Sequence, residues 1–280
     1  MTDREQVLSA QSKGPEHISF MDGLSSLAGF LVGLLVGFTG VGGGALMTPL
    51  LMLAFGVAPQ TAVGTDLLYA AITKSVGSWV HGVRGAVDWT VARLLWLGSL
   101  PASVLTLYSM QSTRFSDDLA RLILPTLGLA LVLTGGVMLA RSWLRQLGER
   151  LQTNFPERFK AQQPALTVLA GTLLGFLVTL TSVGAGALGA VMLVYLYPYR
   201  LKGQKLVGTD IVHAIPLTLL AGLGHANQGH VDLSLLGALL LGSIPGIVVG
   251  ALLSHRVSSN TVRNGVAVMI VIVGAKMLLS

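Results

Sequence analysis

Two aspartates stand inside apolar stretches of the sequence at matching places. Asp66 and Asp210 each end a Val-Gly-Thr-Asp tetrapeptide, and the two tetrapeptides are 144 residues apart. A carboxylate near the bilayer centre costs about 2.5–3.5 kcal/mol on insertion scales, so it usually marks function. Such a group can bind protons or cations, or orient a substrate. Asp is also favoured at helix N-caps, so a helix that starts directly after each aspartate is the alternative explanation.

Three more ionisable residues could take part in ion coupling. Lys74 lies in an apolar run, and Thr218 occupies the matching place. A buried ammonium needs a partner, and Asp66 is a little over two helical turns earlier, so Lys74 could form an ion pair or contact an anionic substrate. Alternatively, the Lys74 side chain extends along the helix so that its ammonium reaches the membrane surface. His81 and His225 also occupy matching places in the two halves, each at the expected end of a helix. They could transfer protons, or they could recur only as part of the repeated architecture.

A glycine-rich break interrupts the apolar pattern once in each half, as TGVGGG at 39–44 and TSVGAG at 181–186. Matching breaks of this kind are the best sequence indication of a transporter binding site. Unwound backbone cannot face lipid, and the helix that resumes presents free N–H groups and a positive dipole end. The breaks therefore predict an anion site, although close helix packing would also explain glycines. The candidate binding residues are Thr39, Gly42, Gly43, Gly44, Thr181, Ser182, Gly184 and Gly186.

The elements that must position these residues are apolar and helical. Hydrophobic residues make up 52% of the 280 residues and charged ones 11%, against about 25% charged in soluble domains. Some of the apolar segments are long enough to span a bilayer, which takes about 20 residues. The two segments that flank each break are short, and form either two spans or a re-entrant hairpin. We predict an all-α integral membrane protein with eight to ten membrane segments, at 24–38, 45–55, 62–80, 91–110, 119–140, 166–180, 187–197, 206–223, 233–253 and 262–279.

The second half of the chain repeats the first. A shift of 142 residues aligns the two breaks, and a shift of 144 aligns His81 with His225 and Asp88 with Asp232. Apolar composition alone would not match these polar residues in one register. The predicted organisation is a polar tail (1–22), a first membrane repeat (23–142), a cytoplasmic connection (143–163) and a second membrane repeat (164–280).

Charge predicts the orientation of the two halves. Lys and Arg concentrate in the connections near 141–163, 200–205 and 255–263, and the positive-inside rule places these in the cytoplasm. The loop at 224–230 is then external. Each half crosses the membrane an odd number of times, so the halves are inverted relative to one another, which is typical of transporters. We expect a multi-pass protein of the cell inner membrane.

Several classes of function are disfavoured. The chain has no Cys, which excludes disulfides and thiolate metal sites, and we expect neither a metal nor a cofactor. The formal charge of +6 sits in short connections and does not indicate nucleic acid binding. An integral membrane enzyme would need clustered acid–base or metal-binding groups, which the sequence lacks. That class and a channel-like pore subunit are kept as alternatives.

The quoted residues resemble the sulfite-exporter TauE/SafE family of membrane transporters. The resemblance rests on GFTGVGGGALMTPLL, AVGTDLLYAAITK, HGVRGAVDW and LGSLPAS, and on the weaker second-half versions TSVGAGAL, LVGTD, GHVDL and LGSIPG. It implies an inner-membrane permease for sulfite, organosulfonates or related sulfur oxyanions. Many relatives carry Ser at the places of Asp66 and Asp210, which bears on coupling and substrate. We expect a secondary transporter that lies in the lipid bilayer and exports a small anion by alternating access. The sequence leaves open whether the transporter forms a homodimer.

Overall fold

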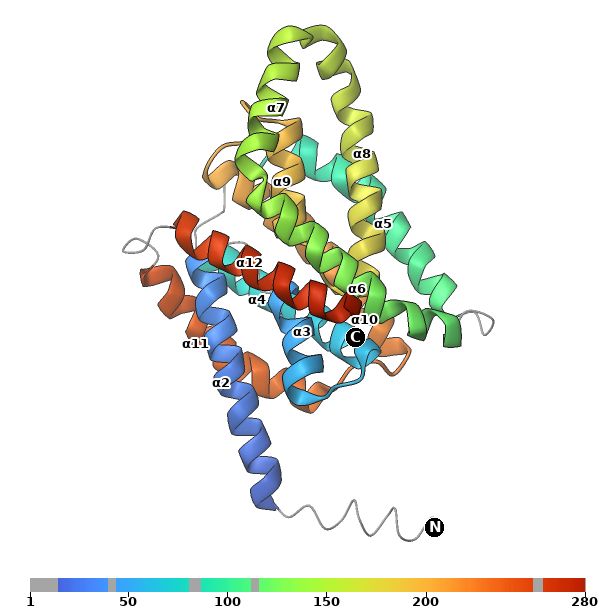
Figure 1. Cartoon of the computed structure of the whole chain (residues 1–280), viewed down its shortest axis with the longest axis vertical. Coiled ribbons are helices and arrows are strands. Elements are labelled where there is room, and N and C mark those ends of the chain that lie inside the picture. The colour runs from blue at the N-terminus through green and yellow to red at the C-terminus, as the bar shows by residue number, and fades with distance from the viewer. Residues whose placement is uncertain (1–14, 40–43, 81–86, 112–115, 254–258, 280) are drawn as a thin grey trace.

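The computed structural model describes residues 15–39, 44–80, 87–111, 116–253 and 259–279, and these ranges are helical throughout apart from turns and short links (Figure 1). The all-helical architecture predicted from sequence is confirmed. The helices are α2 (Pro15–Thr39), α3 (Gly44–Phe55), α4 (Pro59–Val80), α5 (Trp89–Gln111), α6 (Ser116–Leu139), α7 (Arg141–Asn154), α8 (Pro156–Thr181), α9 (Ala187–Leu196), α10 (Gln204–Asn227), α11 (Leu233–Leu253) and α12 (Ser259–Leu279).

Four of these helices are long and apolar enough to cross a membrane: α5, α8, α10 and α11. A fifth span is obtained if residues 124–139 of α6 and helix α7 count as one bent span, with 67° between them. Shorter apolar helices occur at 23–38, 46–55 and 187–196. The chain is therefore a multi-pass membrane protein, and a total of eight to ten membrane segments stays a prediction.

Glycines let two pairs of helices lie with their backbones in contact. Helix α2 runs along α11, and α5 runs along α8 (Figure 1). A Cβ on Gly33 of α2 would overlap the carbonyl oxygen of Ser243, and one on Gly175 of α8 would overlap that of Ser99. Small residues permit this close approach in membrane helices, where apolar burial against lipid gives little driving force.

The same hydrogen bonds are made twice, by residues that match at the 144-residue shift. The Tyr69 hydroxyl of α4 donates to Ser243 Oγ of α11 at 2.8 Å. In the second half, His213 Nε2 of α10 lies 3.0 Å from Ser99 Oγ of α5. Tyr69 matches His213, and Ser99 matches Ser243. The internal repeat in the sequence thus corresponds to a repeat of helix–helix contacts.

The predicted connection at 143–163 is itself helical. Helix α7 and the first turns of α8 form a hairpin at the top of Figure 1. Helix α7 packs against α9, where Gly148 approaches the Tyr195 carbonyl. Three leucines recur at three- and four-residue spacing in the otherwise polar sequence of α7, RSWLRQLGERLQTN. The helix is therefore amphipathic and presents charged side chains beside the membrane helices.

A buried carboxylate anchors the start of α5. Asp88 Oδ1 accepts a hydrogen bond from Val91 N at 3.3 Å, and the guanidinium of Arg200 binds both carboxylate oxygens, at 2.6 and 2.7 Å. Lys205 Nζ lies 3.3 Å from Oδ2. Burial raises the pKa of Asp88, but the hydrogen bonds from Arg200 and its neighbours together outweigh this effect and hold the pKa below its ordinary value.

We expect Asp88→Asn to lower the melting temperature of the purified protein at pH 7. Asn can still cap α5 but loses the ion pair with Arg200. Because the pKa of Asp88 is lowered in the folded state, its stabilising effect is present above the ordinary value of 3.8 and is lost as pH falls through the lowered pKa. The difference from wild type should therefore shrink in melting curves recorded below pH 4.

Asp232 provides the matched control. It caps α11 through Leu235 N at 2.9 Å, as Asp88 caps α5, but it is exposed and none of the ion pairs found among the described residues includes it. Asp232→Asn should therefore change the melting temperature little. Equal effects of the two substitutions would contradict a stabilising role for the Asp88–Arg200 pair.

Candidate functional site

Both aspartates of the repeated tetrapeptide lie inside helices. Helix α4 begins at Pro59 and α10 at Gln204, so Asp66 and Asp210 come about two turns into their helices. The N-cap alternative considered above is therefore wrong. The Thr-Asp pair does not start the helix, because the preceding turn is already helical and the threonines bond elsewhere: Thr65 Oγ1 accepts from Asp232 N, and Thr209 Oγ1 accepts from Asp88 N. Both aspartate side chains are buried.

Asp66 is held by one residue of α3. Its Oδ2 atom accepts hydrogen bonds from Thr48 N at 3.2 Å and from Thr48 Oγ1 at 2.5 Å. Its Oδ1 atom is buried and has no hydrogen-bond partner among the described residues. The Ser182 hydroxyl lies near the carboxylate, but it makes no hydrogen bond of good geometry within the described chain. One oxygen of Asp66 is thus available for a ligand or a proton.

Asp210 has a different environment at the matching place. Its Oδ1 atom lies against the backbone of Gly189 in α9, where a Cβ would come within 2.5 Å of it. At the 142-residue shift that aligns the two breaks, Ala190 matches Thr48. This position of the second half therefore has no hydroxyl that could donate a hydrogen bond to Asp210. Within the described residues, Asp210 Oδ1 has no hydrogen-bond partner. A buried carboxylate oxygen without a partner is costly, which makes this position a candidate site for a cation or a polar ligand.

Lys74 connects these carboxylates to the second glycine break. Its ammonium is buried and donates a hydrogen bond to the Ala185 carbonyl oxygen. It interacts electrostatically with both Asp210 and Asp66, but none of the ion pairs found among the described residues joins it to either one. Lys74 is thus directed into the protein interior and not toward an exposed surface. One ammonium thus contacts the break, and two buried carboxylates interact with it electrostatically.

The second break has an irregular backbone, as its sequence predicts. Ser182 has φ 58°, Gly184 has φ 108° and Gly186 has φ 143°, all in the positive region that favours glycine. Among the described residues, Ser182 is the non-glycine residue with positive φ, a conformation that occurs preferentially at functional positions. Helix α9 resumes at Ala187, directly after Gly186. The break is therefore a turn inside the helical core and not a packing seam alone.

The remaining predicted residues are placed as follows. Thr181 ends α8; its hydroxyl donates to the Leu177 carbonyl and accepts from Val183 N, so it shapes the turn. Thr39 ends α2 and Gly44 begins α3, on either side of the first break. Gly42, Gly43 and His81 lie outside the described residues.

His225 is located at the end of a helix, as expected, but apart from the buried charges. It lies in the last turn of α10, with Nε2 at 2.9 Å from the Thr179 carbonyl oxygen and its ring 5.9 Å from that of His230. These contacts tie α10 to α8 and to the loop before α11. The described contacts of His225 therefore agree with a structural role.

Sequence reasoning did not identify three polar residues around the site. Thr48 is a single hydroxyl in an apolar helix, and no spacing pointed to it. Tyr69 and His213 each follow a buried aspartate by three residues, which places them on the same helix face as that aspartate. The 144-residue shift aligns Tyr69 with His213, but a phenol and an imidazole do not stand out as a matching pair in a sequence comparison.

The fold and its interior define a class: a multi-pass helical membrane protein with ionisable groups buried beside a broken helix. Within that class, the chain belongs to the Sulfite exporter TauE/SafE family, whose model matches residues 25–277. The family expected from the sequence motifs is confirmed.

Curated relatives extend over most of the chain. The probable membrane transporter protein YjnA of Bacillus subtilis (strain 168) is 39% identical over 254 residues, covering 90% of this chain and 98% of that protein. The probable membrane transporter protein YdhB of the same organism is 29% identical over 225 residues (79% and 86%), and one from Xylella fastidiosa (strain 9a5c) is 28% identical over 235 residues (83% and 85%). No solved structure matches.

Proposed function

We propose that this protein is a secondary transporter that carries a small anion across the cell inner membrane by alternating access. The observation that carries the proposal is the electrostatic interaction of Lys74, which contacts an unwound segment of the helical core, with the buried Asp66 and Asp210. Ionisable residues within membrane helices mark substrate or ion pathways. The relatives are named as transporters, and the sequence has no nucleotide-binding motif, so an ion gradient supplies the energy.

The charges at this site give a reason for coupling. With both carboxylates ionised and Lys74 protonated, the cluster carries one net negative charge, which repels an anion. A proton or a monovalent coupling cation such as sodium at the partnerless oxygen of Asp66 or Asp210 would remove that charge. Cation binding would then favour anion binding at the same site. The family description points to sulfite as the anion, and the resemblance of the sequence motifs extends this class to organosulfonates and related sulfur oxyanions.

Repeated contacts support two halves related by a pseudo-two-fold axis around this site. Helix α2 packs against α11, and helix α8 packs against α5. When the two halves are aligned, α8 matches α2 and α5 matches α11. Each pair thus joins the first helix of one half to the fourth apolar helix of the other. A pseudo-two-fold axis would generate this exchange. With the orientation that the charge pattern predicts, that axis lies in the membrane plane, and alternating access would follow as the halves exchange conformations.

The orientation has a direct test, because the chain has no Cys of its own. Single cysteines at Gln152 in α7 and Gln228 after α10 should react with a membrane-impermeant maleimide from opposite sides. We expect labelling of Gln228→Cys in intact cells and labelling of Gln152→Cys only after the membrane is opened. Equal labelling of both in intact cells would contradict the inverted arrangement.

The transport proposal is tested with purified protein in liposomes. Radiolabelled sulfite, sulfate and an organosulfonate such as taurine would be offered under imposed proton or sodium gradients. We expect gradient-dependent uptake of at least one of these anions above that of protein-free liposomes. Failure to move any of them with a monodisperse protein, under either gradient and in either direction, would overturn the assignment to sulfur oxyanions.

A further inference from the structure

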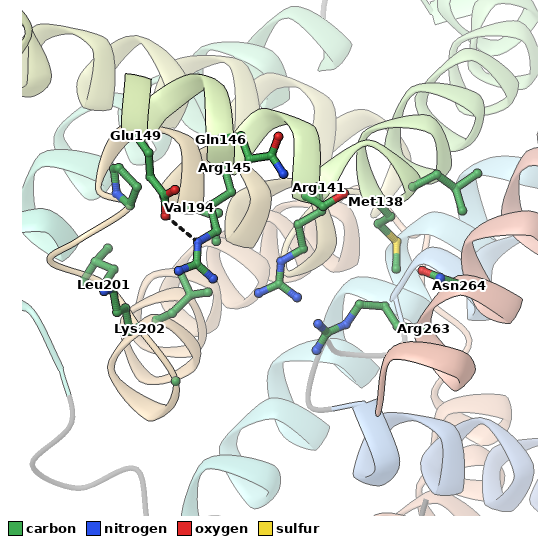
Figure 2. A pocket seen from close by; sticks show the side chains of 15 residues that line it. Met138, Arg141, Arg145, Gln146, Glu149, Val194, Leu201, Lys202, Arg263 and Asn264 are labelled. Atoms are coloured by element: carbon green, nitrogen blue, oxygen red, sulfur yellow. Dashed lines mark hydrogen bonds and ion pairs between the residues drawn. The ribbon is translucent and has the colours of Figure 1, made fainter. Parts of the chain in front are cut away.

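A large cationic pocket opens beside α7. Its volume is about 750 Å³, and it lies between α7, the link from α9 to α10 and the start of α12 (Figure 2). Its charged and amide side chains include those of Arg141, Arg145, Lys202, Arg263, Glu149 and Asn264. The single carboxylate in this set, Glu149, is paired with Arg145 at 2.9 Å. The pocket thus carries a net positive charge.

This pocket leads toward the buried aspartate of the second half. A smaller pocket of about 30 Å³, roughly one water molecule in size, shares Arg141 and Arg263 with the large one. Its other lining residues include Asp210 and Ala187, the first residue of α9. Arg141 and Arg263 therefore stand at the narrowing between an open cationic pocket and the buried charge cluster. In Figure 2 both guanidinium groups point into the open space.

We propose that this pocket is an entry vestibule that binds a small oxyanion, with Arg141 and Arg263 as its principal ligands. Planar guanidinium groups match oxyanions through paired, charge-assisted hydrogen bonds, and several positive charges in a concave site attract an anion from solution. The inference rests on the proposed anion transport for its purpose but not for the binding itself. A paired guanidinium site for an oxyanion beside α7 is predicted whatever the cargo.

The vestibule belongs to one side of the protein only. At the 144-residue shift, Lys202 matches Ala58 and Arg263 matches Leu119, and α7 has no counterpart among the described helices of the first half. These cations are therefore not repeated at the matching positions of the first half. An anion is concentrated at the face that bears α7, which the positive-inside rule places in the cytoplasm. This asymmetry suits a protein that collects its cargo from the cytoplasm.

The first experiment measures binding without transport. Purified full-length protein, stripped of lipid in neutral detergent, would be titrated with inorganic sulfate and sulfite at constant ionic strength, using calorimetry or melting shifts. We expect Arg141→Gln and Arg263→Gln each to weaken binding by about tenfold or more, since each removes charge-assisted hydrogen bonds. Arg150→Gln is the matched control: it removes the same charge from an exposed position of α7 outside the pocket.

A second arm separates a free anion from a lipid headgroup, since both present the same oxyanion chemistry. Native mass spectrometry would compare retention of phosphatidylglycerol by wild type, Arg141→Gln and Arg150→Gln. Loss of sulfate binding with unchanged lipid retention supports an entry vestibule for free anions. Loss of lipid retention without any sulfate binding would overturn it in favour of a lipid site. Equal sulfate affinity of Arg141→Gln, Arg263→Gln and Arg150→Gln would also overturn it.

Transport measured from each side completes the test. In oriented proteoliposomes, Arg141→Gln should raise KM for an anion offered at the α7 face, with a smaller change for the opposite face. If wild type transports an anion and this variant does so with unchanged KM from both faces, the vestibule is wrong and the transport proposal stands. If no anion is transported but sulfate binding still depends on Arg141, the vestibule stands and the transport proposal fails.

Discussion

Replacement of Lys74 by methionine should reduce anion uptake into proteoliposomes by about a hundredfold or more. Methionine has a similar length and flexibility but carries no charge. The substitution removes the cation that interacts electrostatically with Asp66 and Asp210, and it removes the hydrogen bond to the Ala185 carbonyl at the break. Removal of one partner from a buried charge cluster leaves uncompensated charge, which is strongly unfavourable. The initial rate of uptake is the measurement.

A matched control and a second variant separate transport from folding. Lys276→Met removes the same charge from an exposed position near the end of α12 and should transport normally. Lys74→Met combined with Asp210→Asn should recover part of any lost melting temperature, because one carboxylate is removed with the cation. It should not recover uptake. Normal uptake by Lys74→Met in a monodisperse sample would show that the ammonium has no part in transport.

Substitution of alanine for Gly242 should destabilise the fold more than any other single methyl group added to α11. A Cβ at this position would overlap the Ser26 carbonyl oxygen and approach the Phe30 nitrogen within 2.8 Å, so two helix backbones must separate. Overpacking of this kind typically costs about 1–3 kcal/mol, and more when backbone must move. We expect a loss of about 2 kcal/mol or more in the free energy of unfolding, measured in mixed micelles.

Gly237 is the matched control on the same helix. A Cβ there meets no atom of the described residues within 4 Å, so Gly237→Ala adds helix propensity without a clash. This substitution should leave stability unchanged or raise it by up to about 1 kcal/mol. If Gly237→Ala and Gly242→Ala unfold at the same denaturant concentration, close packing of α2 on α11 is not what requires glycine at Gly242.

The helices and the internal repeat could be read from the sequence because they follow from composition and register. Apolar segments of sufficient length must be helical in lipid, and polar residues such as Asp88 and Asp232 recur at one shift. The start of α4 was less predictable. Asp66 suits an N-cap by residue type, yet the helix begins seven residues earlier at Pro59, because proline is favoured at a first helical position.

The site was predicted in part for a physical reason. Ionisable residues in apolar runs identified Asp66, Lys74 and Asp210, and the glycine pattern located the second break where Lys74 reaches it. Local sequence could not show that Thr48 donates to Asp66, since that contact depends on how α3 packs on α4. The cationic vestibule was equally hidden, because its arginines come from α7 and α12, more than a hundred residues apart.

Two hydrogen bonds described above have a consequence for the balance between conformations. A duplicated protein with identical halves would have inward-open and outward-open forms of equal energy, because each form is the other with the halves exchanged. Here a phenol, Tyr69, binds Ser243 in one half, whereas an imidazole, His213, binds Ser99 in the other. These two bonds differ in strength and geometry. If the proposed alternating access holds, divergence at paired positions sets the resting population of the two forms, and with it the side to which the empty protein opens.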